Sequence, residues 1–292
     1  MHPAPSVILF TTLSGAGFGF LACLSLGLLP VTGWAAFFAW GLAYGLAVAG
    51  LLASTFHLGN PQRALRAFTQ WRTSWLSREG WASVTTLALA APGAAEAVFG
   101  WPTGDWTRVT GLLAAAMAIV TILCTAMIYA QLRTVPRWHH WTVPLSFLSF
   151  AAAGGLILAA PGAYAALACL ILGAVMLLQF DRGDRQFALA GSTLAAATGL
   201  GPSVRPFAPA NTSPNYIMRE MIFQVGRKHA LKLRGLALIL GALLPAALML
   251  TLPSGPVASA LAFASYLAGT FAQRWLFFAE ARHVVSHYYG QA

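Results

Sequence analysis

The stretch SVILFTTLSGAGFGFLACLSLGLL, residues 6–29, decides the fold class because none of its side chains carries a charge. A helix of roughly 20 apolar residues crosses a hydrocarbon core of about 30 Å, and its backbone hydrogen bonds are satisfied internally. Seven further runs of this kind follow, at 34–56, 79–100, 108–132, 142–160, 162–180, 232–252 and 256–279. The sequence therefore predicts an all-α polytopic membrane protein, a single membrane domain built as a bundle of eight transmembrane helices.

The composition of the whole chain agrees with this class. Hydrophobic residues make up 58% of the chain and charged residues 8%, against about 45–50% and about 25% in soluble globular proteins. A soluble or disordered protein is therefore excluded. Cys23, Cys124 and Cys169 each stand alone in an apolar run. Since no CxxC pair is present, we expect neither an iron–sulfur cluster nor any other metal site on this chain.

The placement of the basic residues predicts how the bundle is oriented. Prolines and glycines at 30–33, 161–162 and 253–255 predict tight turns, all on one side of the membrane. Of the 17 Lys and Arg residues, only Arg108 belongs to that side. Because positively charged loops stay in the cytoplasm, both termini are predicted to be cytoplasmic. The net charge of +10 comes without a nucleic-acid motif. We therefore expect lipid headgroup contacts and no nucleic acid, and a docking face for protein partners is compatible with this interpretation.

Two cytoplasmic segments have patterns of their own. In residues 61–76, Leu65, Phe68, Trp71 and Trp75 recur at steps of three and four, opposite polar side chains. This spacing predicts an amphipathic helix lying at the interface. Residues 181–231 mix polar and apolar stretches that are too short to span, so we expect a cytoplasmic cap there.

His57 and Glu79 are the first candidates for chemistry, because each lies at a predicted span end. An imidazole at the edge of the hydrocarbon suits a group that hydrogen-bonds a quinone carbonyl. The alternative for His57 is a helix cap that satisfies free carbonyls. Glu79 either exchanges protons in the same pocket or simply favours the dipole at the start of the third helix. Trp71 and Trp75 either belong to an aromatic belt or sandwich a quinone ring.

Haem b is the other cofactor that the histidines raise. His283 and His287 are four residues apart, so they share one helix face and cannot be opposite axial ligands. The remaining histidines are not deep in any span, and we expect no haem on this chain. Arg274 lies inside the last apolar run, where it either extends to the interface or pairs with a carboxylate.

Three short motifs resemble those of one protein family. Residues 57–64, HLGNPQRA, resemble the HLGxPxRA motif of the membrane anchor subunits of dimethyl sulfoxide reductase-type enzymes. Residues 74–79, SWLSRE, are similar to the SxLSxE opening of that family's third helix, and residues 134–138, TVPRW, to its TVPxW segment. The order, spacing and eight-span layout agree over nearly the whole chain. Residues 274–286 look most like the anchors of cytoplasmic sulfite:quinone oxidoreductases.

The resemblance implies a quinone-reactive subunit in a bacterial inner membrane. Such a subunit anchors a molybdopterin catalytic subunit through an iron–sulfur subunit with several clusters. His57 matches the motif histidine implicated at the quinone site (ubiquinone or menaquinone), and Glu79 matches the acidic residue beside it. Arg63 and Arg78 occupy motif positions in the same expected pocket, with Trp71 and Trp75. Reductase anchors of this family often have periplasmic termini, and here the charges predict the opposite.

The resemblance leaves the direction of electron flow open. Sulfite oxidation in the catalytic subunit would send two electrons through the clusters to quinone near His57. The alternative is quinol oxidation that feeds a sulfoxide or polysulfide reductase. A transporter would need ionisable residues at mid-membrane, whereas the middles of these spans are almost entirely apolar. A purely structural anchor, without quinone, is the remaining hypothesis.

Overall fold

The computed structural model describes residues 1–56, 60–101, 104–201, 203–208, 213, 215–221 and 229–289. Within these ranges the structure is helical and contains no strand. The long helices are α1 (Pro5–Ser25), α2 (Gly33–Thr55), α3 (Trp75–Phe99), α4 (Trp106–Ala130), α5 (Thr142–Ala159), α6 (Ala163–Leu189) and α11 (Pro256–Ala279). A further long helix consists of α9 (Ala230–Leu238), the π-helical turn η3 (Ile239–Leu243) and α10 (Leu244–Thr251). Shorter elements are the 3-10 helices η1 (Pro61–Phe68) and η4 (Val284–Tyr289), with α7 (Leu194–Thr198) and α8 (Tyr216–Met221).

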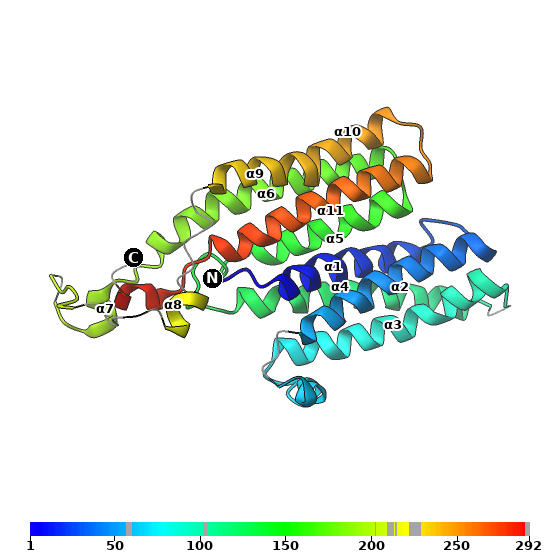
Figure 1. Cartoon of the computed structure of the whole chain (residues 1–292). Coiled ribbons are helices and arrows are strands. Elements are labelled where there is room, and N and C mark those ends of the chain that lie inside the picture. The colour runs from blue at the N-terminus through cyan, green and yellow to red at the C-terminus, as the bar shows by residue number, and fades with distance from the viewer. Residues whose placement is uncertain are drawn as a thin grey trace.

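Seven of the described helices are long and apolar enough to cross a membrane, namely α1 to α6 and the continuous helix Ala230–Thr251. The predicted all-α polytopic membrane protein is thereby confirmed. The helix α11 has the length but is not among these seven, and it lies alongside the other long helices (Figure 1). Its buried residues include Thr270, Gln273 and Arg274, so its polar side chains face other helices and not lipid. That α11 crosses the membrane as an eighth span stays a prediction.

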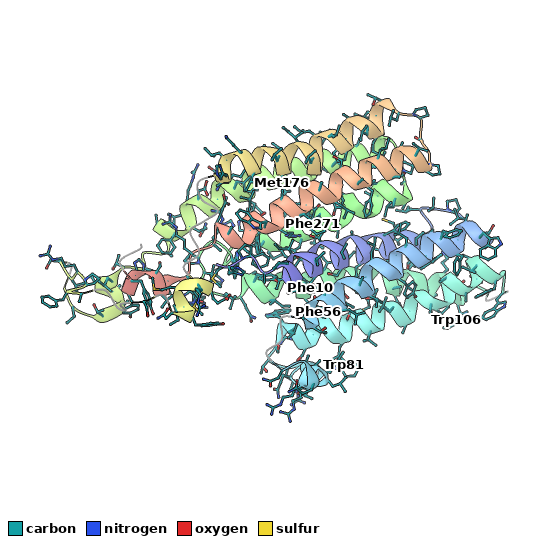
Figure 2. All side chains as sticks on the ribbon, viewed as in Figure 1. Phe10, Phe56, Trp81, Trp106, Met176 and Phe271 are labelled. Carbon is teal, nitrogen blue, oxygen red and sulfur yellow. The ribbon has the colours of Figure 1, made fainter. Side chains whose placement is uncertain are left out.

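The helices run lengthwise, with the short connections α1–α2, α3–α4, α5–α6 and α10–α11 at one end of the bundle (Figure 1). Both termini lie at the opposite end, with α7 and α8, and we call it the terminal end. This is the predicted arrangement of turns and termini, while the side of the membrane on which each end lies stays a prediction. Figure 2 shows Trp81 near the terminal end and Trp106 at the end with the turns.

The helix α1 lies at the centre of the first half of the bundle, where it packs against α2, α4 and α5. Two of its glycines allow the backbones to approach closely. A Cβ at Gly17 would overlap the backbone of Ala47 in α2, and a Cβ at Gly19 would overlap the carbonyl of Ala151 in α5. Helices in lipid associate through such small residues because burial from water does not drive their packing.

Two boundary predictions differ from the structure. One continuous amphipathic helix over 61–76 is wrong, because η1 ends at Phe68 and turns follow up to Ser74. Ser74 then caps α3, its Oγ accepting from the backbone N–H of Ser77 at 3.5 Å. As a result α3 begins at Trp75, and Glu79 lies beyond its first turn. In addition, α6 extends to Leu189, through the first nine residues assigned to the cap.

Candidate functional site

An open pocket lies at the terminal end, between η1, the turns that follow it, and the helices α3 and α4. Its volume is about 780 Å³, within the range of small-molecule sites. Three of its lining residues belong to the predicted quinone site, Trp71, Trp75 and Arg78, and Trp81 lies with them in the lining. The others are Phe68, Thr69, Ala82, Thr85, Met117, Val120 and Cys124. We call this cavity the aromatic pocket.

Helical spacing explains how two walls of the aromatic pocket form. On α3, Arg78, Ala82 and Thr85 follow one another at steps of four and three. On α4, Met117, Val120 and Cys124 do the same. Each set therefore lies on one helix face, and the two faces meet along the α3–α4 contact.

A set of side-chain bonds fixes the turns after η1 against the start of α3. Arg78 donates from Nε to the carbonyl of Trp71 at 3.0 Å and from Nη2 to the carbonyl of Arg72 at 2.6 Å. The Arg78 guanidinium also lies over the Trp75 ring, 4.3 Å from its centroid. Arg78 therefore holds Trp71 and Trp75 in place on the same side of the pocket.

Trp81 makes the corresponding link to η1. Its Nε1 donates to the carbonyl of Phe68 at 3.0 Å, and the two rings meet edge to face with centroids 5.5 Å apart. Ser77 completes the attachment by donating its hydroxyl to the carbonyl of Ala67. The segment from η1 to α3 is thus one structural unit, although its middle lacks regular helix.

Glu79 lies behind the pocket wall and not on it. The residue is 3% exposed, and its carboxyl group accepts a hydrogen bond from the Thr125 hydroxyl of α4. The preceding residue of α4, Cys124, lines the pocket. Further along the same interface, the hydroxyls of Thr86 and Thr121 are 3.2 Å apart. Glu79 therefore opens a polar seam between α3 and α4, one residue away from the pocket lining.

The structure brings together three of the six predicted pocket residues, Trp71, Trp75 and Arg78, with Glu79 directly behind them. Arg63 is exposed on η1 and is not part of the lining. His57 lies outside the described residues, so its place at the site stays a prediction. Trp81 and the α4 face were missed by sequence reasoning, although the steps of three and four from Arg78 would have indicated Trp81.

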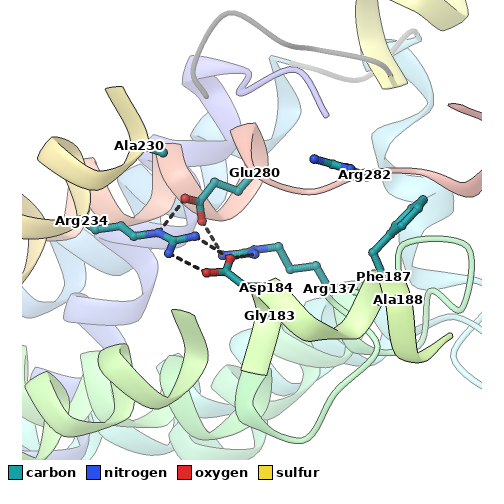
Figure 3. Close-up of a pocket in the computed structure, with 9 residues that line it drawn as sticks. All are labelled: Arg137, Gly183, Asp184, Phe187, Ala188, Ala230, Arg234, Glu280 and Arg282. Atoms are coloured by element: carbon teal, nitrogen blue, oxygen red, sulfur yellow. Dashed lines mark hydrogen bonds and ion pairs between the residues drawn. The ribbon is translucent and has the colours of Figure 1, made fainter. Parts of the chain in front are cut away.

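A second site at the terminal end consists of four charged side chains from four separate elements (Figure 3). Arg234 of α9 donates to both carboxylate oxygens of Asp184 at 2.8 and 2.6 Å, and its Nε donates to Glu280 at 2.7 Å. Arg137 donates to Asp184 at 2.7 Å and also to Glu280. The two cations and two anions alternate, so we call them the charged ring. It joins the α4–α5 connection, α6, α9 and the end of α11.

Arg274 follows neither of the two predictions made for it. The side chain is 1% exposed, so it does not extend to the interface, and among the described residues no carboxylate pairs with it. Its guanidinium lies 3.8 Å from the ring centroid of Phe147 and 4.7 Å from that of Phe150. Two aromatic faces therefore replace the expected anion.

Metal ligands do not gather anywhere in the described part of the chain: no group of three or more His, Cys, Asp or Glu side chains is placed to hold an ion. Two of the histidines considered for haem make local hydrogen bonds, His139 Nδ1 with the carbonyl of Ala130 and His140 Nδ1 with Thr142.

A bundle of apolar helices with its aromatic pocket and charged ring at one end defines a polytopic membrane protein. A sequence model described as DMSO reductase anchor subunit (DmsC) matches residues 1–180. The chain is also 36% identical to the C subunit of the sulfite dehydrogenase of Allochromatium vinosum, over 99% of both chains. The protein therefore belongs to the DMSO reductase anchor subunit family, as the motifs predicted. No solved structure gives a significant match.

Proposed function

We propose that this chain is the quinone-reactive membrane anchor of a sulfite dehydrogenase complex. The observation that carries the proposal is the aromatic pocket, which lies within the matched region and has a buried carboxyl group directly behind it. The identity to a sulfite dehydrogenase subunit over the full length supports the choice of sulfite. The aromatic pocket and the polar seam contain the residue types that quinone chemistry requires.

The shape and lining of the pocket suit an amphipathic ring with a long apolar tail. Trp71, Trp75 and Trp81 offer flat surfaces for a quinone ring. Met117 and Val120 form an apolar wall on the membrane-spanning helix α4, along which an isoprenoid tail can reach the lipid. Arg78 keeps the tryptophans in place and leaves a positive charge beside the ring, which favours the anion formed on reduction.

Reduction of the quinone to quinol takes two electrons and two protons, and we assign the protons to two residues. His57 donates a hydrogen bond to one carbonyl and supplies a proton as the oxygen gains charge. Glu79 holds a second exchangeable proton in the polar seam, with the Thr125 hydroxyl as its bonded neighbour. A carboxyl group on a residue that is 3% exposed needs such a partner, because burying it alone is costly.

The electrons come from partner subunits in this proposal. A molybdopterin subunit oxidises sulfite, and an iron–sulfur subunit with several clusters passes the electrons to the pocket. These partners dock on the terminal end, since the aromatic pocket is there and electron transfer needs a short distance. We place this end in the cytoplasm, with both termini, because 16 of the 17 basic residues belong to that side of a bacterial inner membrane.

The opposite direction of electron flow is the second candidate, and the description of the matching family favours it. In that case this chain would oxidise quinol and pass the electrons to a reductase for a sulfoxide or polysulfide. The same pocket and proton carriers would serve, with each step reversed.

His57→Ala tests the proposal directly. We expect loss of quinone-dependent sulfite oxidation in membranes, while oxidation with an artificial soluble acceptor continues at the wild-type rate. Losing one hydrogen bond to a charged partner weakens quinone binding about tenfold or more, and losing the proton donor slows turnover further. His140→Ala is the matched control, since this histidine lies at the same end but bonds locally to Thr142. Wild-type quinone reduction by His57→Ala would contradict the assignment.

A further inference from the structure

The charged ring borders a second cavity that the quinone chemistry does not use. Its volume is about 350 Å³, and its lining includes the four ring residues together with Phe187 and Arg282. Figure 3 shows Arg282 and Phe187 beside the ring at the same cavity. Ala188 and Ala230 add apolar side chains to the wall. We call this cavity the ring pocket.

Arg282 is the one cation of the ring pocket that has no anion among the described residues. The ring itself is neutral, because Arg137 and Arg234 are matched by Asp184 and Glu280. The Arg282 guanidinium instead lies 5.7 Å from the centroid of the Phe187 ring, and the side chain is half-buried. The ring pocket therefore has one positive charge in excess.

The surroundings of Arg282 add positive charge. The N-terminal ammonium of Met1 donates to the carbonyl of Ala281 at 2.6 Å, one residue before Arg282. Burial and this ammonium lower the pKa of the next residue, His283, so they disfavour a further proton there. A guanidinium with free N–H groups in a partly enclosed pocket binds carboxylates strongly and with defined geometry.

The position of the ring pocket along α6 places it beyond the hydrocarbon. Asp184 lies about 31 Å along the helix from Ala163 at 1.5 Å per residue, which matches the thickness of the hydrocarbon core of about 30 Å. Phe187 and Ala188 lie one turn further. The walls of the ring pocket come from the α4–α5 connection, α6, α9 and the residues that follow α11.

We propose that the ring pocket receives an acidic side chain of the soluble subunit that docks on the terminal end, with Arg282 as its ionic partner. The apolar walls accommodate the methylene stem of an Asp or Glu, and the neutral ring keeps competing charges out of reach. This inference rests on the proposed function, which supplies the docking subunit. It adds the location of one anchoring contact and the chemistry of the partner.

The test is retention of the soluble subunits on membranes washed with increasing salt, measured by immunoblot of pellet and supernatant. With Arg282→Gln, and more so with Arg282→Glu, we expect binding about tenfold weaker and release at lower salt than for wild type. Arg282→Lys keeps the charge and should hold most of the binding. The amount of the anchor in the membrane shows whether each variant has folded.

Arg185→Gln is the matched control, because it also removes one positive charge from the terminal end but lies outside the ring pocket, paired with Asp181 at 2.5 Å. Wild-type retention with Arg282→Glu would overturn the inference, and so would an equal loss with Arg185→Gln. Loss of a bound anionic lipid in native mass spectrometry, with retention unchanged, would also overturn it by assigning the pocket to a lipid headgroup. If wild-type membranes fail to retain any soluble subunit, the proposed function itself fails.

Discussion

The aromatic pocket and the charged ring lie at the same end of the bundle but are built in opposite ways. Most of the aromatic pocket comes from one continuous segment, residues 68–85, joined by one face of α4. Its side chains are fixed mainly by hydrogen bonds to backbone carbonyls. The charged ring joins residues as far apart as Arg137 and Glu280, through side-chain ion pairs alone.

This difference indicates that the two sites have separate roles. A pocket fixed by local backbone bonds keeps its shape when neighbouring helices shift, as suits a binding site that opens to lipid. Ion pairs between four elements instead set the positions of α6, α9 and α11 relative to the α4–α5 connection. The ring should therefore matter for stability and the pocket for turnover, and three pairs of substitutions test this distinction.

Breaking the ring at Glu280 should give the largest effect. Glu280→Gln leaves Arg137 and Arg234, with 13% and 18% of their side chains exposed, sharing one remaining carboxylate. Removing one partner from a largely buried ion pair costs about 2 to 3 kcal/mol at this degree of exposure. We expect a lower Tm in detergent than for wild type, with quinone turnover per assembled complex unchanged.

Asp181→Asn is the control for this prediction, because it breaks the exposed pairs with Arg182 and Arg185 on the same helix, α6. Exposed ion pairs contribute less than about 1 kcal/mol, so the Tm should stay close to that of wild type. If Glu280→Gln and Asp181→Asn lowered the Tm equally, the charged ring would contribute no more to stability than an exposed surface ion pair.

Glu79→Gln should give the second largest effect, on turnover rather than stability. The amide keeps the size of the side chain and still accepts the hydrogen bond from Thr125, but it holds no exchangeable acidic proton. Proton transfer by a positioned group contributes about 100-fold or more to a rate, so kcat with quinone should fall by about this factor while KM changes little. Stopped-flow or steady-state kinetics with a soluble quinone analogue measure both.

Thr86→Val serves as the control for Glu79. It removes a hydroxyl from the same seam, opposite Thr121, without removing a titratable group. We expect kcat within about twofold of wild type, since one hydrogen bond between neutral groups contributes about 1 kcal/mol to stability and none to proton transfer. A wild-type rate for Glu79→Gln would leave the carboxyl group as a packing element of the α3–α4 interface.

The sequence predicted the helices well because the length and apolar composition of each span can be read from its own residues. The run 34–56 corresponds to α2, Gly33–Thr55, and 256–279 coincides with α11, Pro256–Ala279. The apolar run placed the start of the third span at residue 79, whereas Ser74 caps α3 and the helix begins at Trp75. The similarity of residues 74–79 to the helix opening of the family agrees with this earlier start. Glu79 lies on the same helix face as the buried residues Ala82, Ser83 and Thr86, at steps of three, four and seven, and its burial follows from that spacing.

The charged ring could not be predicted in the same way. Arg137, Asp184, Arg234 and Glu280 lie in separate segments, and no spacing rule connects them. Sequence reasoning assigned none of the four to a common site. Their pairing depends on how α6, α9 and α11 assemble, and Arg274 shows the same limit, because its two phenylalanine neighbours come from α5. Local patterns predicted the aromatic pocket in part, whereas the charged ring required the three-dimensional structure.

The smallest effect on quinone binding is expected at Arg63. This residue tests whether a motif position outside the pocket lining contributes to the site. Arg63 and Arg78 both occupy motif positions, but Arg63 is exposed on η1 while Arg78 lines the pocket and donates to two backbone carbonyls. Arg63→Gln removes a solvated charge, for which changes below about 0.5 kcal/mol are typical, so KM for quinone should stay within about twofold. Arg78→Gln removes the bonds that hold Trp71 and Trp75, and KM should rise about tenfold. Both variants are compared in the same membranes, and an equal rise in KM with Arg63→Gln would mean that the quinone site extends along η1.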